Sequence, residues 1–411
     1  MSYQRKILFF LLIISVSFSV RLYGQKANNL YERGMEEFKK NEFQKSIYTF
    51  TEVLSISPTF TEAYIFRGRS YHKLGKSDSA IADFNLALQK RPGFLPAHFY
   101  RAECYTDLKN YAMALPDLNK IIDEKPTFTA AYILRARCNE EQGLIDMAIN
   151  DLTYLVNQGS NDSTVYFRRA NLYVKKKMPK AAIIDLEKVV ELAPRHANAW
   201  YLRATLLESR DKKPAAIENY TKVIDIDPNH EEARFQRARL EFDLKQYEKA
   251  LEDYNYIVEK IKTTNINTYT MRGKCFGAVG RYKDAEKDFA RVLERDPGND
   301  LVFVEKAKMR MSRNDSVGSI PDLRKAIFFN EKNHEAYYLR GRIYYQTKKF
   351  KDAFADLDKS VKLQPTADAL FFRALCFLES GDKNKACVDL VKADEMGSED
   401  AKLLRKKLCG Y

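Results

Sequence analysis

The residues best suited to metal and acid–base chemistry form no constellation in this sequence. It has five histidines: His72, His98, His196, His230 and His334. Protein metal sites draw His and Cys ligands from short, fixed spacings, and these histidines share none. The sequence also lacks a glycine-rich phosphate loop, a nucleophile elbow and an isolated pair of acids. We therefore expect no metal, no cofactor and no catalysis.

Cysteine chemistry is equally restricted, because none of the six cysteines belongs to a CxxC pair. Four of them occupy equivalent places in a repeat described below, where a small buried residue suits packing, and we expect these to be inert thiols: Cys104, Cys138, Cys275 and Cys376. If the chain is exported, a disulfide between Cys376 and Cys387 is an alternative that the sequence does not exclude.

The composition is that of a folded chain with a large core. The 411 residues are 45% hydrophobic and 30% charged, and Gly and Pro are too few for a collagen-like or low-complexity chain. A net charge of +13 favours partners with acidic surfaces and indicates nothing about the fold.

Residues 1–24 have the pattern of an export signal. Arg5 and Lys6 precede an uncharged apolar run over 7–20, and the small residue Gly24 follows. Fourteen residues of helix span about 21 Å, less than the ~30 Å of a hydrocarbon core, so a cleaved signal is favoured over an uncleaved anchor. We expect cleavage after Gly24, with no stable transmembrane span in the mature chain.

The rest of the chain is a repeat. A basic residue followed by Gly or Ala recurs at steps of 33 to 35 residues, at Arg33, Arg67, Arg101, Arg135, Arg169, Arg203, Arg237, Arg272, Lys306, Arg340 and Arg373. We number this residue position 7 of each unit. Eleven units then occupy residues 27–399, and a tail of 400–411 remains.

Large and small residues alternate within each unit at helical spacing. In the second unit, Tyr64 and Gly68 occupy positions 4 and 8, Ala80 and Phe84 occupy positions 20 and 24, and Pro92 occupies position 32. This pattern resembles the tetratricopeptide repeat family. The resemblance implies an all-α, right-handed solenoid of two-helix units, with a groove lined by the first helices. The amphipathic tail is then expected to be a capping helix.

Departures from the pattern predict bends. The ninth unit is the most irregular, with Pro321 inside its expected second helix and the polar turn of residues 314–319. The seventh unit has one extra residue before Tyr269, the fourth ends on Gly159 and Ser160 instead of Pro, and Pro116 is expected to kink its helix.

A charged pattern accompanies the apolar one. Position 7 is basic in every unit, and position 23 is Asp in nine, the exceptions being Thr49 and Asn219. These positions lie about one turn apart on facing helices. We interpret them as a structural Arg–Asp ladder, within or between repeats, and not as a binding site.

The resemblance implies that first-helix positions 2, 5, 9 and 12 face the groove, so function is expected there, and positions 5 and 9 are the most informative. Position 5 is mostly bulky and apolar, and position 9 is often basic, which suits a peptide with apolar anchors and carboxylates. The same residues could instead pack within the solenoid or merely solvate it. The candidate binding residues are Arg69, Phe99, Arg137, Phe167, Tyr201, Phe235, Arg239, Lys274, Lys308, Tyr338 and Arg342.

These features predict a non-enzymatic scaffold of the bacterial periplasm or cell envelope that binds a protein or peptide. Alternatives are a secretory-pathway co-chaperone, which lacks support because no J-domain or retention signal follows the repeats, and an envelope protein that binds polyanions or glycans. A nucleic-acid binder would fit the charge but not the export signal.

Overall fold

The computed structural model describes residues 24–410, and every regular element among them is helical. The predicted signal therefore lies outside the described residues, except for Gly24. The chain divides into two compact units, one up to Leu206 and the other from Leu207, and the boundary falls inside helix α11 (Ala197–Glu208). Each unit is a stack of helical hairpins, so the predicted all-α solenoid is confirmed.

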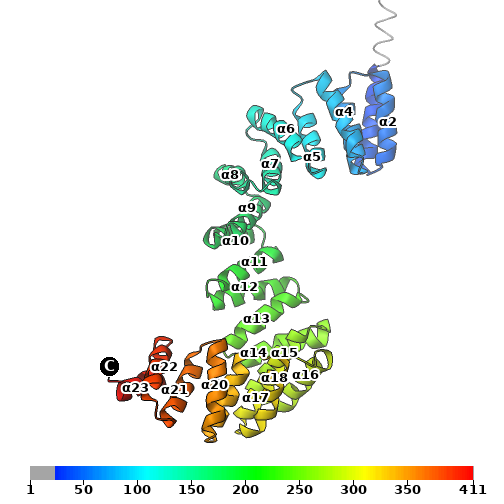
Figure 1. The fold of residues 1–411 in the computed structure, drawn as a ribbon. Helices are drawn as coiled ribbons and strands as arrows, with labels where there is room; N and C mark the ends of the chain where they lie inside the picture. The colour runs from blue at the N-terminus through cyan, green and yellow to red at the C-terminus, as the bar shows by residue number, and fades with distance from the viewer. Residues whose placement is uncertain (1–23, 411) are drawn as a thin grey trace, which may run out of the picture. The chain divides into compact units, whose positions relative to one another are not determined.

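In the first unit, a helix at 24–39 opens a series in which each first helix packs on the second helix of its repeat and on that of the repeat before (Figure 1). The helices that follow are α2 (Phe43–Ile56), α3 (Thr61–Lys73), α4 (Ser77–Lys90), α5 (Leu95–Asp107), α6 (Tyr111–Glu124), α7 (Thr129–Glu141), α8 (Ile145–Asn157), α9 (Ser163–Lys175) and α10 (Pro179–Leu192).

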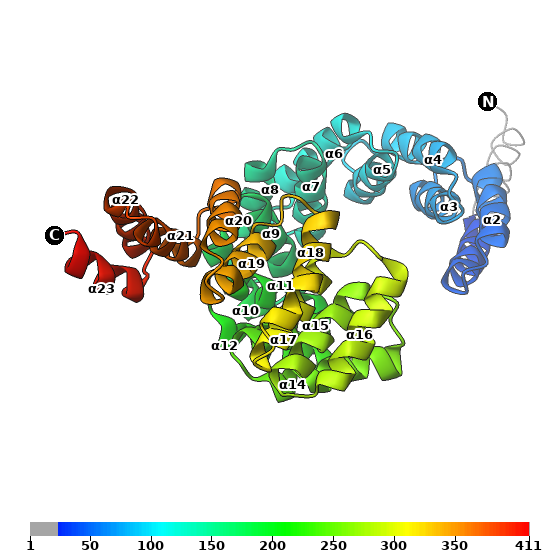
Figure 2. The same ribbon diagram turned by 60° about the horizontal axis from the view of Figure 1, so that its bottom comes forward.

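The second unit continues the pattern, and α14 to α17 lie side by side (Figure 2). Its helices are α12 (Lys213–Ile226), α13 (Glu231–Asp243), α14 (Tyr247–Tyr256), α15 (Ile266–Ala278), α16 (Tyr282–Arg295), α17 (Asp300–Ser312), α18 (Ile320–Phe329), α19 (His334–Gln346), α20 (Phe350–Leu363), α21 (Ala367–Glu379), α22 (Lys383–Glu395) and α23 (Glu399–Leu408).

First helices also contact one another across repeats, as α3 does with α5 and α15 with α17. They therefore form the inner row of each stack, which is the face where the candidate binding residues lie. Among the described residues, no helix is both long and apolar enough to cross a membrane.

The hairpins close through the predicted pair of positions 8 and 24. A Cβ added to Gly68 would lie 2.7 Å from the Phe84 ring, and one added to Gly273 would lie 2.6 Å from Phe289. Real Cβ atoms do not approach other atoms so closely, so Phe at position 24 requires Gly at position 8. Leu357 crowds Gly341 in the same way, at 2.8 Å, whereas the buried Ala102 fits opposite Leu118.

In each irregular repeat the backbone departs from regular α-helix only over a few residues. The extra residue of the seventh repeat widens the end of α14 into a π-turn (Ile257–Ile261), the usual result of inserting one residue into a helix. The expectation that Pro321 sits inside its helix is wrong: a 3₁₀ turn (Val317–Ser319) precedes α18, and Pro321 lies in its first turn, where no hydrogen bond is lost. Pro116 does lie within α6, which continues past it.

The Arg–Asp ladder is present in eight repeats. Arg67 donates from Nε to Asp83 Oδ2 at 2.9 Å and from Nη2 to Oδ1 at 2.6 Å, and the same two-point pairing recurs along the chain. The pairs are Arg67–Asp83, Arg101–Asp117, Arg135–Asp151, Arg169–Asp185, Arg237–Asp253, Arg272–Asp288, Arg340–Asp356 and Arg373–Asp389. The arginines are half-buried and the carboxylates buried.

The ladder also joins neighbouring repeats, because the remaining Nη1 reaches a polar side chain at position 25 of the repeat before. Arg101 donates to Asn85 at 2.6 Å and Arg135 to Asn119 at 2.7 Å. Each of these arginines thus ties together three helices. In the ninth repeat, where Lys306 replaces Arg, Arg310 takes over one turn later, with its Nε 3.1 Å from Asp322 Oδ2.

We predict that Asp253→Ala lowers the melting temperature substantially. Asp253 accepts from both Arg234 at 2.6 Å and Arg237 at 2.7 Å, and removing one partner of a buried ion pair typically costs about 3–5 kcal/mol. Thermal melts followed by circular dichroism would measure this, with the exposed neighbour Glu252→Ala as the matched control. An unchanged melting temperature combined with weakened partner capture would make Asp253 a binding residue instead.

Candidate functional site

The predicted basic residues of position 9 are all on the inner row, but each has a partner within the chain. Arg69 lies over the rings of Phe38, Phe66 and Tyr100, at 4.5 to 4.9 Å from their centroids. Arg342 lies 5.6 Å from the Phe372 ring centroid. These two guanidinium groups are therefore stacked on aromatic faces.

The other four position-9 cations are paired with acids. Arg137 lies 3.6 Å from Asp107, and Arg239 forms an ion pair with Glu208. Lys274 and Lys308 converge on the same Glu305 oxygen, as described below. Sequence reasoning missed Asp107, Glu208 and, for Lys274, Glu305, because each comes from a neighbouring repeat and occupies a different repeat position.

The predicted position-5 residues are only partly available. Phe99, Phe167, Tyr201, Phe235 and Tyr338 are half-buried, whereas Ile65 and Val304 at the same position are buried. Two of the half-buried rings pack on rings of the chain itself: the Phe167 centroid lies 4.5 Å from that of His196, and the Phe235 centroid lies 5.7 Å from that of Tyr254.

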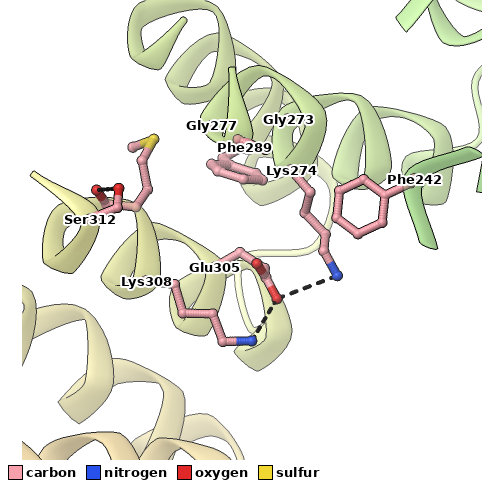
Figure 3. A pocket seen from close by; sticks show the side chains of 10 residues that line it. Phe242, Gly273, Lys274, Gly277, Phe289, Glu305, Lys308 and Ser312 are labelled. Carbon is pink, nitrogen blue, oxygen red and sulfur yellow. Dashed lines mark hydrogen bonds and ion pairs between the residues drawn. The ribbon is translucent and has the colours of Figure 1, made fainter. Parts of the chain in front are cut away.

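In the second unit, these features meet in a hollow of about 210 Å³ between the first helices of three repeats (Figure 3). Phe242 of α13 forms one wall, Phe289 and Met309 contribute apolar surface, and α17 contributes Glu305 and Lys308. Its lining residues are Phe242, Gly273, Lys274, Gly277, Ala278, Phe289, Glu305, Lys308, Met309 and Ser312.

The hollow exists because small residues occupy α15. Gly277 lies at position 12, where the neighbouring repeats carry Phe242 and Met311. A Cβ added to Gly277 would first meet Met309 at 3.8 Å, which is an ordinary contact, so space remains beyond it. Gly in a helix costs about 0.5–1 kcal/mol relative to Ala, and here it leaves open the space beside Phe242.

Charge is balanced at the rim of the hollow. Lys274 Nζ lies 3.5 Å from Glu305 Oε1, and Lys308 Nζ lies 3.1 Å from the same oxygen and 2.7 Å from Glu335. Burial disfavours the charge on Lys308, but the two carboxylates outweigh it and raise the pKa of Lys308. Lys308 therefore stays charged and retains N–H donors for a ligand.

The histidines have structural roles. His72 pairs with Asp107 at 2.9 Å, and His196 and His230 accept from the first turns of α11 and α13. His98 is buried, with Nδ1 donating to Asp117 Oδ1 at 2.6 Å and Nε2 lying 3.0 Å from the Pro92 carbonyl oxygen. No group of His, Cys, Asp and Glu in residues 24–410 is arranged to hold a metal ion.

The four position-10 cysteines are free and buried, as expected. Desolvation raises the pKa of Cys104 and Cys275 to about 12, so these thiols are unreactive. The suggested Cys376–Cys387 disulfide is wrong: Cys387 of α22 is joined to Cys409, just after α23, with 5.8 Å between their Cα atoms. This pair could not be predicted from the sequence, because Cys409 reaches α22 only when the capping helix folds back on it.

Family models described as tetratricopeptide repeat match residues 67–127, 163–196, 197–230, 266–299 and 334–367. Three of these matches begin and end at the first and last positions of the repeats derived from the sequence. The comparison with curated proteins gave no match.

Several solved structures resemble the chain. Yeast Tom70 is 15% identical, with coverage of 93% of this chain and 94% of that one and a TM-score of 0.46. The C-terminal part of a repeat-containing protein from Cytophaga hutchinsonii is 19% identical, covering 67% and 98%, with a TM-score of 0.46. A Parabacteroides merdae protein is 18% identical, covering 68% and 97%, with a TM-score of 0.42. These values support no conclusion about function.

We predict that Glu241→Gln stabilises the protein increasingly as the pH rises. Burial raises the pKa of Glu241 from 4.5 to about 7, opposed by Arg237. Between these values the folded chain holds a proton that the unfolded chain releases, so stability falls as the pH rises through this range. The gain in melting temperature should be larger at pH 8 than at pH 5.

The exposed carboxylate Glu252 provides the control, and Glu252→Gln should show no such trend. A difference between Glu241→Gln and the unaltered protein that stays constant with pH would show that Glu241 titrates normally.

Proposed function

The chain belongs to the tetratricopeptide repeat family, and from that premise we propose that it is a non-enzymatic scaffold of the bacterial periplasm or cell envelope. Stacked repeats of this kind present extended concave surfaces to which other proteins bind. The observation that carries the proposal is the hollow at Gly277, an apolar recess on the inner row with charged donors at its rim.

The chemistry of this hollow indicates what the partner presents. Phe242, Phe289 and Met309 favour an apolar side chain. Lys274 and Lys308 share one oxygen of Glu305, so a carboxylate of the partner can compete with Glu305 for both. The proposed partner is thus a protein segment with an apolar anchor next to Asp, Glu or a terminal carboxylate.

Export is supported by the pattern of residues 1–24 and by the Cys387–Cys409 disulfide. Structural disulfides persist in oxidising compartments and are rare in the cytosol. The disulfide ties α23 to α22, so it holds the helix that covers the last repeat. The buried free thiols of the other cysteines are protected in such a compartment.

The groove can be tested with Gly277→Leu. The Leu side chain should fill the hollow and prevent the partner from binding. The control is Gly277→Ala, which gives the same gain in helix propensity but leaves most of the hollow open. Cross-linked pull-downs from the native envelope would compare the two variants with the unaltered protein. Loss of the same captured protein from Gly277→Leu alone, with helicity intact, is the expected result; identical capture by all three would refute the site.

To test the compartment, native protein should be alkylated during cell lysis and analysed by mass spectrometry. We expect an amino terminus at Gln25 and Cys387 linked to Cys409. Cys387→Ser should lower stability by about 2–4 kcal/mol through the loss of the cross-link. Recovery of the full-length chain with both cysteines alkylated would place the protein in a reducing compartment.

A further inference from the structure

Three repeats of the first unit break the rule by which the chain begins its first helices. Phe60, Phe94 and Phe128 are the N-cap residues of α3, α5 and α7, and none forms a side-chain cap. From α9 onward every first helix begins with a residue whose side chain accepts from the first turn. These residues are Asp162, His196, His230, Asn265, Asn299, Asn333 and Thr366.

The missing caps have a cost in stability. Replacing a polar N-cap by an apolar residue destabilises a helix by roughly 1 kcal/mol. The first helices of three consecutive repeats lack a side-chain cap, and those of all later repeats have one. Local rules are broken in this way where a side chain serves another purpose.

The rings of Phe94 and Phe128 line a pocket of about 440 Å³ at the start of α5 and α7. This volume lies in the range of roughly 300–1,000 Å³ typical of ligand sites. Phe99, one of the predicted groove residues, forms the wall between them, with its ring 5.2 Å from Phe128 in an edge-to-face contact. The lining residues are Arg91, Gly93, Phe94, Leu95, Pro96, Phe99, Tyr100, Lys125 and Phe128.

A basic side chain lies over the face of each of these two rings. The Arg91 guanidinium lies 4.6 Å from the Phe94 centroid, and Lys125 Nζ lies 5.7 Å from that of Phe128. They occupy the same position in consecutive repeats, so each ring has one cation over its face.

The charge of this pocket is not balanced, unlike that of the hollow in the second unit. No carboxylate lines it. Arg91 has one acidic neighbour, Glu62 at 3.7 Å, and both side chains are exposed, so that pair is weak. Lys125 lies over the Phe128 ring and forms no ion pair with any of residues 24–410.

We propose that this pocket binds a protein segment in which an aromatic or large aliphatic side chain lies next to an Asp or Glu carboxylate. The apolar side chain enters between Phe94, Phe99 and Phe128, and the carboxylate pairs with Lys125 and Arg91. The inference rests on the proposed scaffold function and adds to it a second recognition site, separate from the hollow at Gly277.

The test uses a double variant, Phe94→Asn with Phe128→Asn. Asn is the residue that caps α17 and α19, so the variant removes both rings and supplies the missing caps. The matched control is Phe60→Asn, the same change in α3, which among the described first helices from α3 onward is the one that lacks a side-chain cap and whose N-cap does not line the pocket. Thermal melts of the variants verify folding.

The probes are fluorescein-labelled hexapeptide libraries with a fixed central pair and randomised flanks, applied to the immobilised mature chain. We expect retention of the Phe–Asp library to exceed that of the Phe–Asn library by about tenfold, the effect of one charged hydrogen bond. It should exceed that of the Ala–Asp library by about as much, the effect of burying one large apolar side chain. In the Gly277→Leu background, which closes the other proposed site, the double variant should abolish this preference and Phe60→Asn should keep it. Equal retention of the three libraries by the unaltered protein would overturn the proposal.

Lys125→Gln with Arg91→Gln gives an independent reading, because both side chains are exposed and their loss does not threaten folding. This variant should lose the preference for Asp over Asn and keep that for Phe over Ala. A dimer in sedimentation that depends on Phe94 and Phe128 would instead assign the pocket to a second copy of the chain. All of these measurements are made in the Gly277→Leu background, because the hollow at Gly277 is proposed to take a segment of the same chemistry. A preference that persists there belongs to the pocket at Phe94 and Phe128, and one that disappears belongs to the hollow, so failure here and failure of the groove proposal are distinguishable.

Discussion

The two-point pairing of Arg at position 7 with Asp at position 23 is the constraint on which the stacks depend. It holds the two helices of a repeat together, and the third bond to position 25 fixes the preceding repeat against them. Buried charges are tolerated only when paired. The ladder therefore penalises any slip of one repeat along another, which apolar contacts between smooth helix faces would penalise weakly. Where Arg is lost in the ninth repeat, Arg310 restores a pairing to Asp322.

This rigid frame leaves the surface of the first helices free to vary. Gly277 opens a hollow because the ladder and the Gly–Phe contacts already hold α15 in place. Phe94 and Phe128 can replace capping residues for the same reason. Both recesses are places where a locally unfavourable residue is retained, and both lie where aromatic rings meet basic side chains.

The hollow at Gly277 and the pocket at Phe94 and Phe128 differ in how their basic side chains are paired, and this decides what a ligand must displace. At Gly277 the lysines are held by Glu305 and Glu335, so a ligand must displace an internal partner. At Phe94 and Phe128 the cations rest on rings and have no strong acidic partner. The overall positive charge of the chain is therefore not spread evenly along the groove, and a basic stripe inferred from position 9 alone overstates what a ligand meets.

The sequence by itself determined the repeat phase, the pairing of helices and the ladder. These features depend on residues a few positions apart on one helix, or at a constant sequence offset between two helices. Such patterns can be recognised from the sequence alone. It also indicated the small partner of each large residue, as with Gly68 and Phe84. Only the tertiary structure decided which acids neutralise Arg137, Arg239 and Lys274, that Cys387 pairs with Cys409, and where recesses remain. Those contacts join different repeats, and stacking brings them together in a way that no spacing within a repeat encodes.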